Sequence, residues 1–584
     1  MPTSRHRSEP RRRSADTGPP RAALALAAIG ALAALGLAIW WLIRPRGVDW
    51  AAERGIALLE SAPPESHAAV LDAWERETGF AWAFRREALR DHLLERIESR
   101  GARALLSRVW RVDFADRAVD WRRFRNSLKR TERREQPPLT AGERIRLTPR
   151  WEHPAPVGLT AWFSAILPLD GRIFVASLGR AFDDPADDAD GVVVVDGASG
   201  RSEFFFVPEG RGPRDVVGLV AVSNGLLVAV RNGNVHRISR DGITQWTTSA
   251  GSSLISPPLC LPLDRDDQPD IVVMNAAHEV VAINGANGRV LWRRGLLPRG
   301  ADTSGRPPVY PTLAAGNVWS PTELNVVAAT WSGQLAVLNS GGEVRWTATY
   351  PTGFAAAATC TPPATEGGPT LYVADRAGRV RSFTRSGREM RVVQEWDADP
   401  TGRSGLFASV RTIRSRDPGV APLLITATGG SATDPRGTLS GLADDGLRWR
   451  APLGGAAWAA PAIADLSGDR RADIVVLSRG PAPEGGEMGL LEIFNADGHV
   501  VLAYRITAPA DSSAVIADVD GARNGALELL WADRDGHLFC YETGQAGPVE
   551  WGVAAGDARG TCNAGWAFSF GQRAFGDQWR WAPE

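Results

Sequence analysis

From about residue 143 onward, apolar and polar residues alternate, and short glycine-containing turns interrupt the alternation. One repeat can be divided completely into four strand-like segments, which are LISPPLCLPLD (254–264), IVVMNAAH (271–278), VVAING (280–285) and RVLWRRG (289–295). Four short alternating segments joined by Gly, Asp and Asn turns are typical of a small antiparallel sheet. The pattern therefore predicts a series of four-stranded sheets.

A glycine turn followed by a large residue returns eight times between about residues 155 and 555. The position holds Trp246, Trp292, Trp346, Trp449 and Trp551 in five repeats, Phe204 and Leu502 in two more, and Arg391 in one, where the aromatic residue is displaced to Trp396. Successive anchors lie 42 to 58 residues apart, which is the period of a propeller blade. We predict a mainly β fold, an eight-bladed β-propeller of four-stranded antiparallel blades, within residues 151–584.

Two segments outside these repeats have the pattern of an additional outer strand. One is ERIRLTPRW (143–151), and the other is part of the tail 562–584. A ring must join its last blade to its first, and pairing of one of these segments with the opposite end of the chain would remove exposed sheet edges. Residues 136–150 are therefore predicted to be a linker that contains a candidate ring-closing strand.

Residues 22–43 are free of charged residues and proline. At about 1.5 Å per residue, such a helix spans the roughly 30 Å core of a bilayer. Six arginines precede the segment, which places the N-terminus in the cytoplasm and the rest of the chain outside the inner membrane, in the periplasm. A cleaved signal peptide is less favoured, because the apolar run is long and no small-residue cleavage site follows it.

The flanking segments are basic. Residues 1–21 have a net charge of +4 and are predicted to be a disordered Arg-rich tail, and residues 44–150 have a net charge of +6. Within 50–135, Leu89, Leu93 and Ile97 recur at helical spacing, which predicts a membrane-proximal helical region, either a small domain or a solvated spacer. The remaining chain carries −11, so a nucleic-acid partner is not expected for the propeller.

The repeats resemble those of the quinoprotein-like (PQQ-like) propeller family. The family pattern A-x-D-x-x-T-G-x-x-x-W is visible in AINGANGRVLW (282–292), with Asn284 and Asn287 in place of Asp and Thr. IADLSGDRRADIVVL (463–477) is similar to the FG-GAP/VCBS type of repeat. The resemblance covers roughly residues 150–555 and implies that the signature tryptophans pack between neighbouring sheets. Proteins of two functional classes have such repeats. The chain resembles the non-catalytic propeller subunits of envelope assembly machinery, and it is also similar in fold to the quinoprotein dehydrogenases.

The FG-GAP resemblance implies a candidate calcium loop formed by Asp465, Ser467, Asp469 and Asp473. Calcium needs six to eight hard oxygen ligands, so several carboxylates must converge on one turn. Ser467 stands where an acidic residue is usual, and Arg470 stands where glycine is usual. A bound calcium ion and a hydrogen-bonded or salt-bridged turn therefore both remain open.

Other acidic segments fit a metal site less well. Asp264, Asp266 and Asp270 occupy the equivalent turn, but Pro262 stands where the first ligand should be, so a structural role is expected. In the segment that begins with Asp518 and Asp520, the last acidic residue, Glu528, lies two positions beyond the last ligand position of the loop pattern. The acidic loop 183–190 is predicted to be a solvated loop, with a weak cation site as the alternative.

The sequence carries little that indicates catalysis. It lacks HExxH, GxSxG and CxxCH motifs, and it lacks the adjacent cysteines that quinoprotein dehydrogenases use. Cys260 and Cys360 occupy equivalent positions two blades apart and are not expected to pair. Cys540 and Cys562 are left open as a disulfide or as free thiols.

Three loops predicted to join second and third strands are long, namely 180–191, 429–437 and 479–489. They belong to the first, sixth and seventh blades, which would flank the eighth blade in a closed ring. Long loops of compact folds are often functional, so we predict a partner-docking sector there, with neutral surface variation as the alternative. The prediction is thus a membrane-anchored protein scaffold of the bacterial envelope. A PQQ-dependent membrane oxidoreductase and a calcium-dependent adhesion or glycan-binding module are the alternatives.

Overall fold

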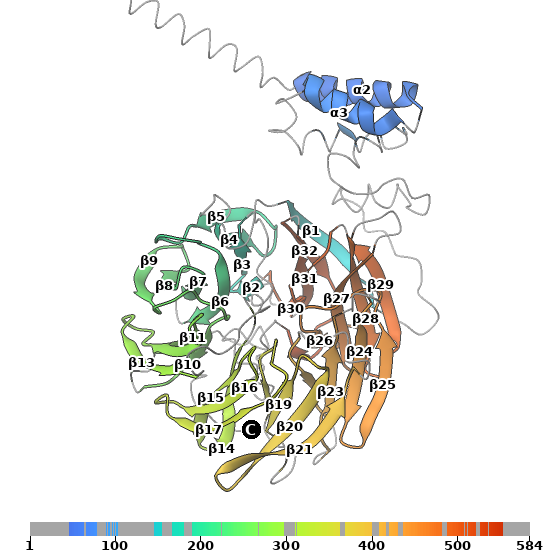
Figure 1. Ribbon diagram of the computed structural model, residues 1–584. Helices are drawn as coiled ribbons and strands as arrows, with labels where there is room; N and C mark the ends of the chain where they lie inside the picture. Colours follow the sequence, from blue (N-terminus) through green and yellow to red (C-terminus); the bar gives the residue numbers. More distant parts are fainter. Residues whose placement is uncertain are drawn as a thin grey trace, which may run out of the picture. The chain divides into compact units, whose positions relative to one another are not determined.

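The structure is a computed structural model of the 584-residue chain (Figure 1). Near the N-terminus it describes residues 46–63, 66–78, 89, 92–93, 96, 99, 101–102 and 105. It then describes residues 145–552, apart from 155–165, 180–189, 223–224, 265, 267, 297–309, 311, 362–367, 369, 400–407, 416–419, 430–435, 482–486, 507, 511, 521–525 and 535. The chain divides into two compact units, residues 1–131 and 132–584.

The first unit contains two helices, α2 (Arg46–Ser61) and α3 (His67–Thr78). Trp74 of α3 is fully buried, and its indole N–H donates to the Ala51 carbonyl oxygen of α2 (2.7 Å). A Cβ added to Gly55 would lie 2.8 Å from the Trp74 ring nitrogen, so the missing side chain is what lets the two helices approach. Leu89 and Leu93 are buried as well. The described part of this unit therefore has a hydrophobic core of its own.

The predicted membrane span, residues 22–43, lies outside the described residues. Among the helices that the structure does describe, none is both long enough and apolar enough to cross a bilayer.

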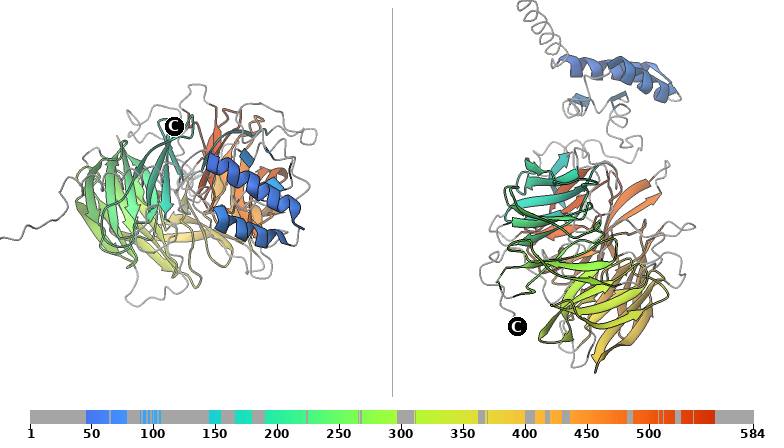
Figure 2. Two further views of the ribbon diagram at one scale, coloured as in Figure 1. Left: turned by 90° about the horizontal axis from the view of Figure 1, so that it is seen from above. Right: turned by 60° about the vertical axis from the view of Figure 1, so that its left-hand side comes forward.

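The second unit is mainly β and consists of eight antiparallel sheets arranged as an eight-bladed propeller (Figures 1 and 2). Blade 1 consists of β2–β5 (Ile166–Leu169, Arg172–Leu178, Asp190–Asp196, Ser202–Phe206), and blade 2 consists of β6–β9 (Val216–Val222, Gly225–Val230, Asn234–Ser239, Thr244–Ser249). Blade 3 consists of β10–β13 (Leu259–Leu261, Asp270–Met274, Glu279–Ile283, Val290–Gly295), and blade 4 consists of β14–β17 (Leu313–Ser320, Glu323–Ala329, Gln334–Asn339, Val344–Thr349). Blades 5 and 6 are β18–β21 (Thr359–Cys360, Leu371–Ala374, Arg379–Ser386, Glu389–Asp397) and β22–β25 (Arg411–Ile413, Leu423–Ala427, Thr438–Ala443, Gly446–Pro452). Blade 7 has β26–β29 (Ala462–Ala464, Asp473–Pro481, Glu487–Asn495, Val500–Ile506) and a fifth strand, β33 (Val549–Trp551). Blade 8 combines β30–β32 (Val515–Ala517, Glu528–Ala532, His537–Glu542) with β1 (Thr148–Pro154).

The outermost strand pair has the same irregularity in every blade. One residue of the outer strand is skipped in the pairing register, and the next residue is the signature residue, as with Arg345 before Trp346 in blade 4. The skipped residues of blades 1 to 8 are Glu203, Gln245, Leu291, Arg345, Val393, Arg448, Val501 and Arg150. Such a β-bulge increases the local twist and re-aims the following side chain. Here it directs the signature residue toward the next blade.

The signature tryptophans bind the turn between the third and fourth strands of the next blade. The Trp246 indole N–H donates to the Gly285 carbonyl oxygen (3.1 Å), and that of Trp292 donates to Ser340 (2.8 Å). The rings lie against glycines in these turns. Gly288 has a φ of 76°, and a Cβ there would come within 2.9 Å of the Trp246 ring. Trp449 repeats the contact with Ala496 (2.9 Å). The predicted structural role of these tryptophans is confirmed.

Blade 5 corrects one sequence assignment. Arg391 was expected in the signature position, but it lies before the bulge at Val393, and Gln394 occupies that position. The Gln394 amide donates to the Asp444 carbonyl oxygen (2.5 Å), and the displaced Trp396 donates to Ala443 of the same turn (2.7 Å). The β20–β21 hairpin is longer than its counterparts, so counting residues from the turn misplaces the signature position.

The N-terminal strand closes the ring. β1 pairs antiparallel with β32 and becomes the outer strand of blade 8, as the candidate closing strand at 143–151 suggested. Trp151 follows the bulge at Arg150, and its indole N–H donates to the Gly197 carbonyl oxygen of blade 1 (2.9 Å). A Cβ on Gly200 would come within 2.4 Å of the Trp151 ring. Trp151 is therefore the signature residue of blade 8.

Trp551, which the sequence pattern assigned to that role, lies elsewhere. It ends β33, which pairs with the innermost strand of blade 7, β26, and touches the inner strands β22 and β30 of the flanking blades. Trp551 is 1% exposed, and its indole N–H donates to the Thr412 carbonyl oxygen of β22 (2.9 Å). β1 already occupies the outer position of blade 8, so the chain beyond β32 turns inward instead.

We predict that Trp151→Ala destabilises the propeller by about 3–5 kcal/mol, because it removes a large buried side chain and the contact that closes the ring. Ile243→Ala, at a residue that directly precedes β9 and is 68% exposed, serves as the control and should change stability by less than about 0.5 kcal/mol. Denaturant unfolding of both variants measures the difference. Equal stability of the two variants would contradict the assignment of Trp151 as the closing residue.

Candidate functional site

The predicted calcium loop lies between β26 and β27 and is stabilised by hydrogen bonds from its own backbone. The two Asp465 carboxylate oxygens accept the N–H groups of Gly468 (2.7 Å) and Arg470 (2.8 Å). One Asp473 oxygen accepts those of Leu466 and Ser467. Arg470 adopts a left-handed conformation with a φ of 67°, the conformation that the usual glycine would adopt more easily. Three carboxylates do not converge in this loop, so calcium binding there stays a prediction.

The equivalent turn of blade 3 does bring three carboxylates together. One oxygen each of Asp264, Asp266 and Asp270 lies within 4.8 Å of the others. Asp270 is fully buried and accepts the backbone N–H groups of Leu263 (2.9 Å) and Gly285 (3.0 Å). The Asn284 amide donates to both Asp264 and Asp266. The group thus serves to hold this turn against the next one.

A second such group in blade 8 contains its own cation. Asp518, Asp520 and Glu528 lie within 4.8 Å of one another. Arg150, the bulge residue of the closing strand, donates to Asp520 (2.7 Å) and Glu528 (2.8 Å). The Glu528 carboxylate also accepts the Val519 N–H (2.9 Å). The guanidinium group supplies the positive charge at this cluster and ties β1 to blade 8.

Burial raises the pKa of the three carboxylates that begin the second strands. The pKa of Asp270 and of Asp473 rises to about 6, and that of Glu528 rises to about 7, although backbone N–H groups and Arg150 oppose the shift. The same position thus carries the same buried, backbone-bound acid in blades 3, 7 and 8. A feature repeated in three blades points to a structural role in the turn rather than to one unique active site.

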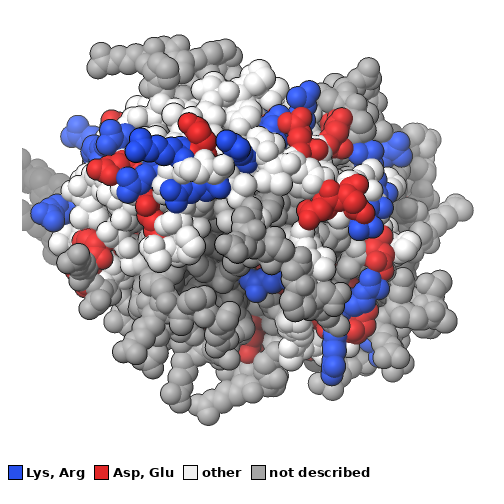
Figure 3. All heavy atoms as spheres, turned by 90° about the horizontal axis from the view of Figure 1, so that it is seen from below, with Lys and Arg blue, Asp and Glu red and all other residues white. Residues whose placement is uncertain are grey.

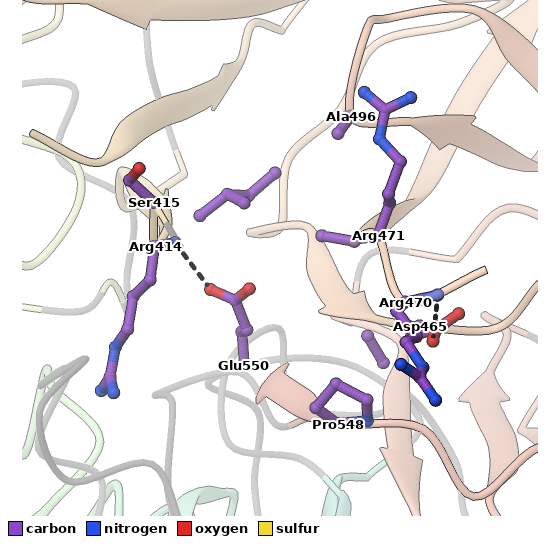
Figure 4. Close-up of a pocket in the computed structure, with 11 residues that line it drawn as sticks. Arg414, Ser415, Asp465, Arg470, Arg471, Ala496, Pro548 and Glu550 are labelled. Atoms are coloured by element: carbon purple, nitrogen blue, oxygen red, sulfur yellow. Dashed lines mark hydrogen bonds between the residues drawn. The ribbon is translucent and has the colours of Figure 1, made fainter. Parts of the chain in front are cut away.

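A cavity of about 310 Å³ opens between blades 6 and 7 (Figure 4). Its walls include Arg414, Arg470 and Arg471, and Glu550 of the C-terminal segment projects into it. One Glu550 oxygen accepts the Arg414 backbone N–H (3.0 Å), and burial raises the pKa of Glu550. The Arg414 and Arg471 side chains extend away from each other, and Arg471 pairs with Asp497 (2.7 Å). The guanidinium groups therefore do not converge on a common anion.

Several predicted features fall outside the described residues. These are most of the predicted long loops 180–191 and 429–437, residues 482–486 of the third loop, residues 183–189 of the acidic loop, and Cys562. The other residues of 479–489 extend β27 and β28, so the third loop is shorter than predicted, and Asp190 is a buried residue of β4. Cys260, Cys360 and Cys540 are buried, and burial raises the pKa of Cys540. Cys260 and Cys360 are not joined by a disulfide, which agrees with the prediction.

Charges of both signs lie side by side on the propeller surface. Figure 3 shows one such face, where basic and acidic side chains alternate. Pairs such as Arg172 with Glu203 (2.7 Å) and Arg345 with Glu323 (2.8 Å) account for part of this arrangement. On the described surface in this view, the two signs are mixed.

The fold defines the class of the protein, a closed eight-bladed propeller whose blades are joined by tryptophan-to-turn contacts. A family model described as "Outer membrane protein assembly factor BamB" matches residues 106–318. The match and the eight blades confirm the predicted resemblance to the PQQ-like propeller family. No curated protein matches the chain in sequence.

Solved structures of several propellers are similar to the chain, and each covers 68% of it. BamB from Moraxella catarrhalis is 14% identical over 100% of its own length, with a TM-score of 0.43. Sqt1 from Saccharomyces cerevisiae is 9% identical over 98% of its length, with a TM-score of 0.49. Quinohemoprotein alcohol dehydrogenase from Comamonas testosteroni is 11% identical over 76% of its length, with a TM-score of 0.47. At these identities and scores, nothing about function follows from the similarity.

The raised pKa values predict an unusual dependence of stability on pH. The folded state holds protons on Asp270, Asp473 and Glu528 at pH values where the unfolded chain has lost them, so the stability that they contribute is lost as pH rises from about 4 to about 7. His236 opposes this, because burial lowers its pKa to about 4. Burial also raises the pKa of Glu492 and Glu550, so five carboxylates act against one histidine. With a chelator present to exclude metal binding, we expect the unfolding temperature to be higher at pH 5 than at pH 7.5. Calorimetry at both pH values tests this, and the opposite order would contradict it.

Proposed function

We propose that the protein is a non-catalytic interaction scaffold, anchored in the inner membrane by residues 22–43, with its propeller in the periplasm. The apolar segment, the arginines before it and the basic region after it support the anchoring and the orientation. The closed ring supports the scaffold role, because it gives a rigid platform whose loops vary without loss of the fold.

The observation that carries the proposal is the position of β33. A propeller can hold a planar cofactor near its axis, where the inner strands of many blades approach one another. In this chain, β33 lies against the inner strands β22, β26 and β30, and the fully buried Arg411 stacks on Trp551 at 4.4 Å. The chain's own side chains thus fill this part of the inner surface. At blades 6 to 8, this filling favours recognition by the loops and the outer surface over a cofactor bound near the axis.

The acidic turns support the same proposal. Their buried carboxylates accept backbone N–H groups or the Arg150 guanidinium group, so their hydrogen-bonding capacity serves the fold. A catalytic acid or base needs access to a substrate as well as a shifted pKa. Asp270, Asp473 and Glu528 are each at most 3% exposed.

The proposed docking sector consists of the long loops of blades 1, 6 and 7. The closing strand belongs to blade 8, and residues of blades 8 and 1 share one hydrophobic cluster. Blades 1 and 7 therefore flank blade 8, and blade 6 adjoins blade 7. We predict that shortening the segments between these second and third strands, at 180–189, 430–435 and 482–486, abolishes partner capture in crosslinked envelopes without lowering the unfolding temperature, because the paired strand residues stay intact. Shortening 362–367, a loop between the first and second strands of blade 5, is the control. Unchanged partner capture by the variant with the three shortened loops would contradict the proposed docking sector.

The rival classes have direct tests. PQQ with calcium is added to the purified exported region, residues 50–584, and absorbance and dye-linked alcohol oxidation are measured. Stoichiometric cofactor binding together with dye reduction would replace the scaffold with an oxidoreductase. Glycan binding that a chelator abolishes would favour the adhesion class.

For calcium itself, the geometry predicts at most weak binding at the Asp465 loop, because both Asp465 oxygens accept backbone N–H groups. Titration calorimetry of residues 50–584, beside an Asp465→Ala/Asp469→Ala variant, measures this. Binding at micromolar or tighter affinity that the variant loses would establish the site and strengthen the adhesion alternative.

A further inference from the structure

Helix α2 of the first unit uses one side for the core of that unit. α2 and α3 lie side by side (Figure 2), and the Trp74 indole of α3 donates to the Ala51 carbonyl oxygen. At 3.6 residues per turn, the buried residues of α2 form one continuous side of the helix. They are Ala51, Ala52, Gly55, Ile56 and Leu59.

Trp50 lies in the middle of the opposite side. At about 100° per residue, Leu59 of the buried side is diametrically opposite Trp50, and an arc of about 60° around Trp50 includes three more residues. We term these four residues the α2 outer face, which consists of Trp50, Arg54, Ala57 and Ser61. All four are exposed, and Trp50 is 53% exposed. The Trp50 ring is therefore directed away from the core that α2 shares with α3.

The acidic residues beside the α2 outer face interact with the unit itself. The Glu53 carboxylate lies 3.0 Å from a ring nitrogen of His92 and pairs with Arg96 at 2.8 Å. Glu60 accepts the Ser99 hydroxyl group (2.5 Å). Glu53 and Glu60 both lie at the same edge of the face, so its centre presents an indole ring and a guanidinium group.

The chain brings this face close to the predicted membrane span. α2 begins three residues after the apolar segment 22–43 ends, and three residues reach at most about 10 Å. The lipid headgroup layer on each side of the hydrocarbon core is about 5–8 Å thick. If α2 continued straight away from the bilayer, Trp50 would lie about 10 Å beyond the hydrocarbon core, outside this layer. If α2 runs along the surface, the whole outer face lies at headgroup depth.

We propose that the first unit rests on the periplasmic surface of the membrane through the α2 outer face. Trp50 lies in the headgroup layer, and Arg54 contacts anionic lipid headgroups. Indole rings favour this layer because one part of the ring is apolar and the N–H is polar. Basic side chains are attracted to anionic lipids. The inference rests on the proposed anchoring by residues 22–43 and adds to it an orientation of the first unit.

A second copy of the chain fits the α2 outer face less well. Helices that pair with each other present a stripe of apolar residues at a spacing of three and four positions. At this spacing from Trp50, α2 has Arg54, Ala57 and Ser61, so the face offers only one large apolar side chain to another helix. The headgroup layer accommodates an indole ring and a cation together, which is the mixture that the face presents.

A fluorescent label at Ala57→Cys tests the proposal in the full-length protein. Cys562→Ser is included, and Cys260, Cys360 and Cys540 are buried. The protein is reconstituted in nanodiscs that contain phosphatidylglycerol and a lipid with a nitroxide on its headgroup. The control label is at Ala69→Cys, an exposed residue on the side of α3 away from Trp74. We expect at least about twofold stronger quenching at position 57 than at position 69, because only the former lies at headgroup depth.

Substitutions at the face separate its two contacts. Trp50→Glu should lower the quenching at position 57 to the level at position 69, whereas Trp50→Tyr should keep most of it, since tyrosine also favours the interface. Arg54→Glu should lower the quenching in phosphatidylglycerol and have less effect in neutral phosphatidylcholine. Because Trp50 and Arg54 are exposed, the unfolding temperature should stay nearly unchanged in all three variants.

Three results would overturn the proposal. They are equal quenching at positions 57 and 69, quenching at position 57 that Trp50→Glu leaves unchanged, and a disulfide between two copies through Ala57→Cys that Trp50→Glu abolishes, which would assign the face to a second copy. An equal effect of Arg54→Glu in both lipids would remove the headgroup contact of Arg54.

Extraction of membranes with alkaline carbonate is a separate readout for the anchoring. If the full-length chain stays in the membrane while positions 57 and 69 are quenched equally, the anchoring stands and the proposal for the α2 outer face fails. Release of the chain by carbonate would contradict the anchoring itself.

Discussion

The hydrogen bond from a signature indole to the turn of the next blade determines how the propeller is assembled. Trp246, Trp292 and Trp449 each donate to a carbonyl oxygen of that turn. Each ring lies against a turn glycine with positive φ, where any side chain would collide with the ring. A buried indole N–H needs an acceptor, so each contact fixes both the distance and the orientation between two blades. The β-bulge before the indole provides the direction.

A ring needs one junction per blade, and blades 1 and 7 use Phe204 and Leu502 in place of an indole. The last junction must join the two ends of the chain. β1 supplies it through two neighbouring residues. Trp151 reaches the turn of blade 1, and Arg150 reaches Asp520 and Glu528 of blade 8. Loss of Arg150 would leave two partly or fully buried carboxylates without their cation, and such uncompensated charge is costly. Closure therefore combines packing with charge, and it displaces the chain beyond β32 to the inner side of blade 7.

The sequence was sufficient for the blade number and for most signature residues, because both follow from local periodicity. It failed where the contact is not local. GQAG followed by Trp551 looks like any other repeat, and only the pairing of β1 with β32 shows that Trp151 has that role. The arrangement of the acidic turns also depends on more than spacing. Spacing favoured the Asp465 loop, whereas carboxylates converge in blades 3 and 8, since competition from backbone N–H groups decides where each carboxylate points.

The repeat also indicates where specificity can arise. Residues that form the bulge, the signature contact and the buried carboxylates of the acidic turns hold the blades in place. Substitutions there are therefore expected to lower stability before they alter recognition. β21 begins at Glu389 and reaches its signature residue at Gln394, whereas β17 begins at Val344 and reaches Trp346 two residues later. The bulge at Val393 and the contact of Gln394 with the turn of blade 6 are both present, so the added length of β21 lies between the hairpin turn and the bulge.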